Sequence, residues 1–152
     1  MGRALIAIGA ALAVAFLGFG LVVYLTRQED RVAVDNMLAE DITRAIQLSE
    51  DQREDVDLRR LAPFAWDRVL VVEPGTSRDA VSQALGTEYK GDLPFGSSGT
   101  VFVFARGKAL ARFADYRGRA TFTGFERPLD VLPRARAVLR VRNLVVSPAR
   151  AE

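Results

Sequence analysis

The stretch GDLPFGSSG, residues 91–99, has the residue types that come nearest to catalytic chemistry. It places the adjacent hydroxyls of Ser97 and Ser98 in a glycine-rich loop, where a nearby lysine is a candidate base to activate one of them. A general base must lie within hydrogen-bond reach of the serine, and no spacing in the sequence fixes that geometry. Loops of this composition are usually connections, so we treat this one, with Asp92, as a candidate contact surface.

Carboxylates are the second group of side chains suited to chemistry, because a pair of them can share acid–base work. The candidates in the domain are Asp67, Glu73, Asp92, Asp115 and Asp130. No spacing singles out two of them. The chain also has neither His nor Cys, which excludes a Ser-His-Asp triad, a Cys nucleophile, an ordinary zinc site, a disulfide and a lipid-bearing Cys. We therefore expect no enzyme activity, no cofactor and no metal.

The segment VVEPGTSRDAVSQALG, residues 71–86, has the outline of a phosphate-binding loop, since an apolar stretch leads through a glycine turn into a helical pattern. A P-loop requires a longer glycine-rich loop ending in Lys and Ser or Thr, and dinucleotide binding requires G-x-G-x-x-G. The segment has neither motif. We interpret it as architecture, in which Thr76 is the N-cap of a helix, Asp79 completes a capping box and Gly86 ends the helix.

The segment Ala4–Leu25, ALIAIGAALAVAFLGFGLVVYL, contains no charged residue. About twenty apolar residues span a bilayer as a helix, so we expect residues 1–27 to form a transmembrane anchor. The alternative is a cleaved signal peptide, but cleavage after Ala15 would leave an apolar end on the mature protein. The flanking positive charges nearly balance. A short lead before the helix is typical of a signal anchor, which would place the remainder outside the cytoplasm.

Residues 28–55 combine an amphipathic stalk helix with a charged linker. Four apolar residues recur at intervals of four, which gives a helix an apolar stripe. These residues are Val34, Leu38, Ile42 and Ile46. The stripe covers either the domain of its own chain or a second copy, and both alternatives stay open. Small residues between 7 and 15 offer a further face for pairing in the membrane, so self-association would run through residues 7–15 and 34–46.

Residues 56–147 are predicted to form an α+β domain, followed by a tail at 148–152. FAWDRVLVV, residues 64–72, is predicted to be a central strand, because apolar residues occur on both of its faces. By strict alternation, Phe64 and Trp66 share a face with Leu70 and Val72.

The rest of the domain is predicted to be antiparallel. TVFVFARGKALARFA, residues 100–114, has the pattern of a hairpin with its turn around Gly107. ATFTGF, 120–125, is a further short strand. AVLRVRNLVV, 137–146, alternates as one half-exposed strand at an edge. The order is strand-helix-strand-strand-strand, which gives one helix packed on a small, mostly antiparallel sheet.

Charge is distributed unevenly along the chain. Residues 29–57 contain ten acidic residues and three arginines, whereas residues 106–150 contain eleven basic and three acidic ones. Either the acidic stalk lies against the basic part, or the arginines are simply solvated, or the basic part meets anionic lipid, a protein partner or nucleic acid. Nucleic acid is the least favoured partner. A candidate interaction surface comprises Trp66, Asp67, Asp92, Ser97, Ser98, Arg140 and Arg142.

Two stretches, LAPFAWDRVLVVEPGTSRDAVSQALG and VFVFARGKALARF, resemble a family of small uncharacterised bacterial proteins that are secreted or membrane-anchored. The pattern F-x-W-D-x-V-x-V-x-x-P-x-T begins at Phe64, and a helix ending in L-G and a hairpin with Gly107–Lys108 follow. More distantly, PGTSRDAVSQALG resembles the capped helix of small outer-membrane assembly lipoproteins and β-lactamase-inhibitor-like domains. The latter resemblance implies an α+β binding module without catalysis, although the lipid-bearing Cys of the lipoproteins is absent here.

These observations predict a single-pass protein of the inner or plasma membrane. Its α+β domain would lie outside the cytoplasm and bind a protein or another component of the cell envelope. One alternative is a hydrolase-like domain that uses Ser97 or Ser98, or a pair of carboxylates. The other is a domain that faces the cytoplasm and binds anionic lipid or nucleic acid.

Overall fold

The computed structural model describes residues 35–91, 93 and 99–149, all of which belong to one compact unit, Val32–Glu152. The predicted anchor, residues 1–27, lies outside the described residues. Within the described part of the chain, no helix is both long enough and apolar enough to cross a bilayer.

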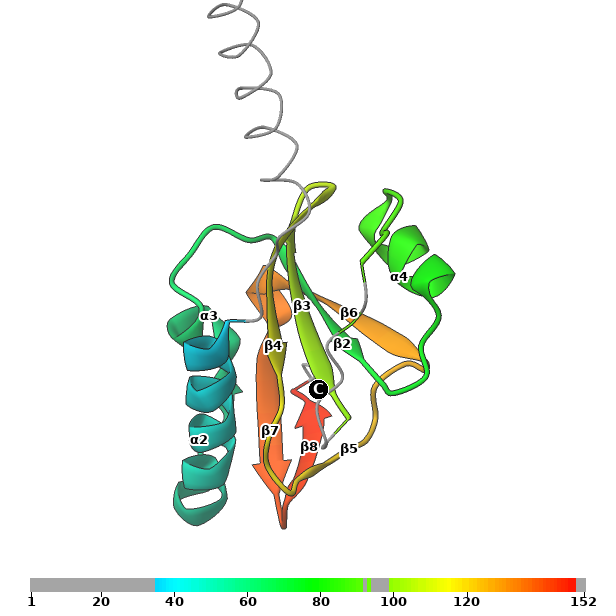
Figure 1. Cartoon of the computed structure of the whole chain (residues 1–152). Helices are drawn as coiled ribbons and strands as arrows, with labels where there is room; N and C mark the ends of the chain where they lie inside the picture. The colour runs from blue at the N-terminus through cyan, green and yellow to red at the C-terminus, as the bar shows by residue number, and fades with distance from the viewer. Residues whose placement is uncertain (1–34, 92, 94–98, 150–152) are drawn as a thin grey trace, which may run out of the picture. The chain divides into compact units, whose positions relative to one another are not determined.

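The described residues form two four-stranded sheets, three α-helices and one 3₁₀ turn (Figure 1). The helices are α2 (Asn36–Gln52), α3 (Leu58–Leu61) and α4 (Arg78–Leu85), and the 3₁₀ turn is η1 (Arg134–Arg136). The strands are β1 (Val56–Asp57), β2 (Arg68–Val72), β3 (Val101–Arg106), β4 (Ala109–Asp115), β5 (Thr121–Phe122), β6 (Leu129–Pro133), β7 (Val138–Arg142) and β8 (Val145–Pro148).

Sheet A has the strand order β4-β3-β2-β6, and sheet B has the order β1-β7-β8-β5. All neighbours pair antiparallel except β5 and β8, which are parallel. The predicted α+β class is therefore confirmed. The prediction of a single sheet is wrong, because the strands after the β3–β4 hairpin do not all extend sheet A. Only β6 joins sheet A, while β5, β7 and β8 form a second sheet with β1.

Sheet A is buried on both faces, and this follows from apolar residues at successive positions of its two central strands. On β2, Val69 and Val71 enter one core cluster, whereas Leu70 and Val72 enter another. β3 continues the division, because its two phenylalanines join the first cluster and its smaller residues the second. The prediction that 64–72 contains a central strand is thus confirmed.

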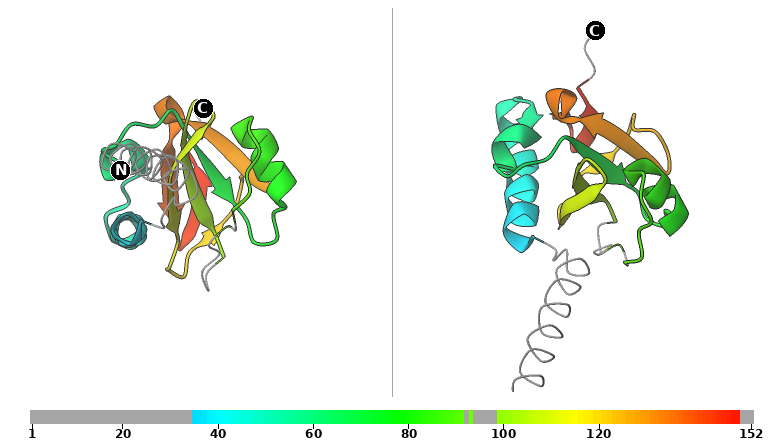
Figure 2. Two further views of the ribbon diagram at one scale, coloured as in Figure 1. Left: turned by 45° about the horizontal axis from the view of Figure 1, so that its top comes forward. Right: turned by 90° about the horizontal axis from the view of Figure 1, so that it is seen from above.

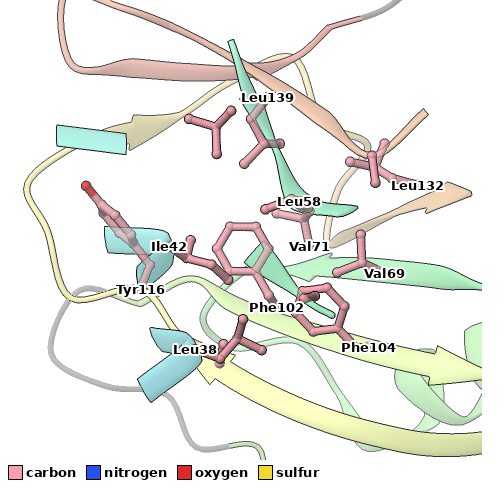
Figure 3. Packing of buried hydrophobic residues seen from close by; sticks show 14 of the residues in the cluster. Leu38, Ile42, Leu58, Val69, Val71, Phe102, Phe104, Tyr116, Leu132 and Leu139 are labelled. Carbon is pink, nitrogen blue, oxygen red and sulfur yellow. The ribbon is translucent and has the colours of Figure 1, made fainter. Parts of the chain in front are cut away.

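The first face of sheet A packs against sheet B, with α2 and α3 beside it. Figure 3 shows Phe102 among side chains that come from both sheets and both helices. Phe102, Ile42, Leu58 and Leu139 are each completely buried, so the segment before β2 and the segment after β6 share one core.

The second face of sheet A is covered by α4 and the segment that follows it. Val81 and Leu85 of α4 are buried there, and Tyr89 packs edge-on against Phe113 of β4 with ring centroids 6.0 Å apart. Figure 2 shows α4 and α2 on opposite sides of the strands. Gly86 ends α4 in the left-handed conformation, with φ of 72°, as a glycine directly after the helical pattern predicts.

α2 packs against β4 and β7 and buries its stripe within the unit itself. Leu38, Ile42 and Ile46 are at most 4% exposed. Of the two alternatives for this stripe, the structure therefore shows the one in which it covers its own domain. Val34 and residues 7–15, the other parts of the predicted self-association surface, lie outside the described residues.

Three local predictions are corrected by the structure. Trp66 packs with Val69 and Val71 and not with Leu70, because β2 begins only at Arg68 and the residues before it break the alternation. The N-cap of α4 is Ser77, whose hydroxyl accepts a hydrogen bond from the Ala80 amide at 3.2 Å.

Thr76 has a different role from the predicted cap. Its hydroxyl donates to the carbonyl oxygens of Glu73 and Pro128, at 2.6 and 3.0 Å. The hydroxyl thereby links the turn before α4 to the segment that leads into β6.

The segment 137–146 is a hairpin rather than one edge strand. Asn143 and Leu144 have φ of 52° and 57°, values typical of a type I′ turn between paired strands. The turn reverses the chain, so Val146 is buried instead of Val145. β7 lies between β1 and β8, and only its outward-facing residues are exposed.

The burial of α2 predicts that it is part of the folding unit. Ile42→Ala should lower the free energy of unfolding of the fragment 32–152 by about 2–5 kcal/mol, because it leaves a cavity in the main core. Urea unfolding followed by circular dichroism measures this. Leu48→Ala on the same helix is the control, since Leu48 is 49% exposed, and it should change stability by about 0.5 kcal/mol or less. Equal, small effects of both substitutions would show that α2 folds apart from the sheets.

Candidate interaction surface

Asp67 connects three segments at the end of sheet A where β2 begins. Its backbone N–H donates to Ala105 at 2.9 Å, and its carbonyl accepts from the Arg134 amide at 2.8 Å. Its carboxylate accepts hydrogen bonds from the Gly107 amide and from Arg68, the latter at 2.9 Å. Asp67, one of the candidate carboxylates, is thus engaged in both an ion pair and a turn contact.

The same contacts set the electrostatics of Asp67. The hydrogen bond from the Gly107 amide, with those from Arg68 and the charge of Arg106, lowers the pKa of the Asp67 carboxyl below its ordinary value of 3.8. The carboxylate therefore stays charged at neutral pH and fixes the β3–β4 turn. Gly107 itself has φ of 57°, a conformation that L side chains adopt only with strain.

Trp66 lies in the core and offers almost no surface, since it is 4% exposed. Its indole N–H donates to the Ala62 carbonyl at 3.0 Å, and its ring meets Phe104 edge-on at 5.1 Å. The Arg134 guanidinium lies 5.3 Å from the ring centroid, within range of a cation–π contact. Trp66 thus packs on the core side of the residues around Asp67 and holds Arg134 in place.

The other residues of the predicted surface lie elsewhere or are not described. Arg140 and Arg142 are on the outward face of β7, and Arg142 pairs with Asp55 at 3.5 Å. Within the described residues, no hydrogen bond or ion pair joins either arginine to Trp66 or Asp67. Asp92, Ser97 and Ser98 lie outside the described residues.

The acidic N-terminal part lies against the basic part of the domain, which is one of the possibilities left open by the sequence. Asp35 pairs with Arg112 of β4, and Arg117 donates to Asn36 at 2.6 Å and to the Asp115 carboxylate at 2.9 Å. Farther along α2, Glu50 accepts from the Leu144 amide at 2.9 Å.

One group of cations is left out of this pairing. Its members are exposed and make no ion pair within the described residues, and they come from α3, the β3–β4 turn and η1. They are Arg60, Arg106, Lys108, Arg134 and Arg136. We call this group the basic end.

The contacts already described hold the segments of the basic end together. Asp67 joins the β3–β4 turn to η1, and the Leu58 amide donates to the Ala137 carbonyl at 3.0 Å, which joins α3 to η1. The acids at this end already have partners: Asp57 binds Arg59 at 2.7 Å, and Asp67 binds Arg68. The basic end therefore carries an uncompensated positive charge.

The chemistry available to the basic end is the binding of anions. Guanidinium groups match phosphate and carboxylate oxygens with paired donors, and Lys adds a point charge. Within residues 35–91, 93 and 99–149, no three metal-ligating side chains converge. Sequence reasoning counted the basic excess after residue 106 but did not place it, because the contribution of Arg60 and the folding of η1 beside the hairpin turn are tertiary features.

In comparisons with known proteins, no protein-family model, curated protein or solved structure matches this chain. The resemblances drawn from the sequence motifs accordingly stay predictions.

Asp67→Ala should destabilise the β3–β4 turn, because it leaves the Gly107 amide and Arg68 without their acceptor. We expect the free energy of unfolding to fall by about 1–3 kcal/mol, the range for a lost hydrogen bond to a charged group. Urea unfolding of the fragment 32–152 measures the loss. Amide exchange should accelerate most at Gly107. Asp41→Ala, an exposed position on α2, is the control and should change neither quantity appreciably.

Stability should fall in acid through three carboxyl groups. The pKa of Asp35 is lowered by the Leu38 amide and Arg112, that of Asp57 by Arg59, and that of Asp67 by Gly107 and Arg68. In the unfolded chain each has a pKa of about 3.9. Their stabilisation is therefore fully present above about pH 5 and is lost as the pH falls through 4 towards the lower folded values.

The measurement is the free energy of unfolding between pH 7 and pH 2, compared for the wild-type chain and a variant with Asp35, Asp57 and Asp67 replaced by Asn. The variant should be less stable at pH 7 and show a shallower decline. Parallel curves for the two proteins would contradict the assignment.

Proposed function

We propose that this protein is a single-pass, membrane-anchored protein of the cell envelope, without catalytic activity. Its α+β domain would be displayed on the outer side of the membrane and bind a protein or another envelope component. The observation that carries the proposal is the uncharged segment Ala4–Leu25 directly before a compact domain. A segment of that length and composition suits a helix that spans the bilayer.

The interior of the domain also supports a binding role. Trp66 and the buried phenylalanines of β3 serve packing, and Asp67 is engaged in holding a turn. The conspicuous surface feature of the described residues is the basic end, which has no neutralising partner of its own. A surface of this kind is suited to recognition through charge.

The basic end also favours a second candidate function. A domain that faced the cytoplasm would present the same cations to anionic lipid or to nucleic acid, both of which carry closely spaced phosphates. For the hydrolase alternative, Ser97 and Ser98 lie outside the described residues. Of its candidate carboxylates, Asp67 pairs with Arg68 and Asp115 with Arg117.

Topology and attachment test the proposal together. A reporter active only outside the cytoplasm, fused after Glu152, should be active, and a matched fusion active only in the cytoplasm should be silent. The full chain should remain with membranes after a wash at alkaline pH. A variant lacking residues 4–25 should appear in the soluble fraction. An active cytoplasmic fusion would overturn the orientation, and release by the wash would overturn the anchor.

A further inference from the structure

The basic end brings together five exposed cations from three segments, none of which makes an ion pair within the described residues. Several arginines elsewhere do have acidic partners: Arg112 has Asp35, Arg127 has Glu73 and Arg142 has Asp55. The two acids at the basic end, Asp57 and Asp67, are instead each bound to an arginine outside this group. The charge of Arg106 contributes to lowering the pKa of Asp67, and that of Arg60 to lowering the pKa of Asp57.

The start of α2 lies nearer to this end than the rest of the helix does. The Asp35 amide donates to the Phe113 carbonyl in the second half of β4, and α2 then runs away from the β3–β4 turn, since Arg117 meets Thr43 and Leu144 meets Glu50 farther along the helix. Figure 1 shows the β3–β4 turn at the top of the unit and the last turn of α2 at the bottom. The first described residue is thus nearer to the basic end than the C-terminal half of α2 is.

The length of chain before Asp35 limits how far the domain can lie from its anchor. Only residues 26–34 separate the uncharged segment from Asp35. Even fully extended, such a stretch reaches roughly 30 Å, about the diameter of a small domain. A bilayer that contains anionic lipid attracts nearby Lys and Arg strongly within about one Debye length of its surface.

We propose that the basic end binds the anionic phospholipid headgroups of the membrane that holds the anchor, and so orients the domain on the bilayer. This inference rests on the proposed anchor, but it does not depend on which side of the membrane the domain faces. The β3–β4 turn and η1 then lie against the headgroups. The C-terminal half of α2 and the β7–β8 turn point away, and they stay available to a partner.

The test uses the full chain reconstituted into vesicles of phosphatidylcholine, alone or with about one third phosphatidylglycerol. Since the chain has no Cys, Ala109→Cys carries a single donor dye beside the turn, and Gln47→Cys carries it on the far half of α2. Energy transfer to an acceptor on the lipid headgroups reports proximity. Phosphatidylglycerol should increase transfer from position 109 but not from position 47, and the increase should shrink at high salt.

Matched variants separate this site from general charge. A triple variant with Gln in place of Arg106, Lys108 and Arg136 should weaken docking to the bilayer by at least about tenfold. It should also remove the effect of phosphatidylglycerol on energy transfer. The control replaces three exposed arginines away from the basic end, Arg44, Arg119 and Arg127, by Gln and should keep the effect. The single variant Lys108→Glu, at the exposed turn, keeps the test decisive if the triple variant unfolds.

The outcomes distinguish the inference from the proposed function. Failure of the chain to float with the vesicles would overturn the anchor, and with it the inference. If the chain floats with the vesicles but phosphatidylglycerol does not change energy transfer from position 109, the inference is overturned and the anchor is not. A response of the dye at position 109 to a short single-stranded DNA, without one to phosphatidylglycerol, would also overturn it, because the cations would then serve nucleic acid.

Discussion

The rest of this structure depends on the burial of both faces of sheet A. Central strands β2 and β3 are apolar at every position except Arg68 and Arg106 at their ends, so neither face can be left to water. One helix, α4, covers the second face. The first face needs a larger cover, and sheet B with α2 provides it. α2 is therefore part of the core, since its detachment would expose its own Ile42 and Ile46 together with the residues of the sheets that they cover.

The central position of β2 explains why Asp67 matters. β2 pairs with β3 on one side and β6 on the other, so the residue that precedes it is next to both the β3–β4 turn and η1. A carboxylate there can bind a turn amide while its own backbone binds η1. The arrangement brings two basic turns side by side, and the cation–π contact of Arg134 with Trp66 couples them to the core.

The sequence was informative wherever a short segment determines its own structure. The β3–β4 hairpin, α4 with its glycine end, and the central strand were all predicted from local patterns. Non-local features were missed. Two-residue strands such as β1 carry no periodic signal, and β6 contains the buried Asp130 and ends in a proline. The hairpin of β7 and β8 was missed because Asn143 and Leu144 lack the glycine that usually marks such a turn.

The charge of the candidate surface also combines a local feature, which the sequence shows, with a non-local one, which it does not. Net charge is only +2, and the acidic and basic regions of the sequence nearly cancel. Folding does not cancel them evenly, because α2 has a fixed length and direction and its acids reach only the arginines beside it. Cations on α3, on the hairpin turn and on η1 lie beyond that reach, and they come together only because β2 joins their segments. The uncompensated charge is therefore a property of the topology, and a substitution that separates η1 from the turn would disperse it without changing the composition.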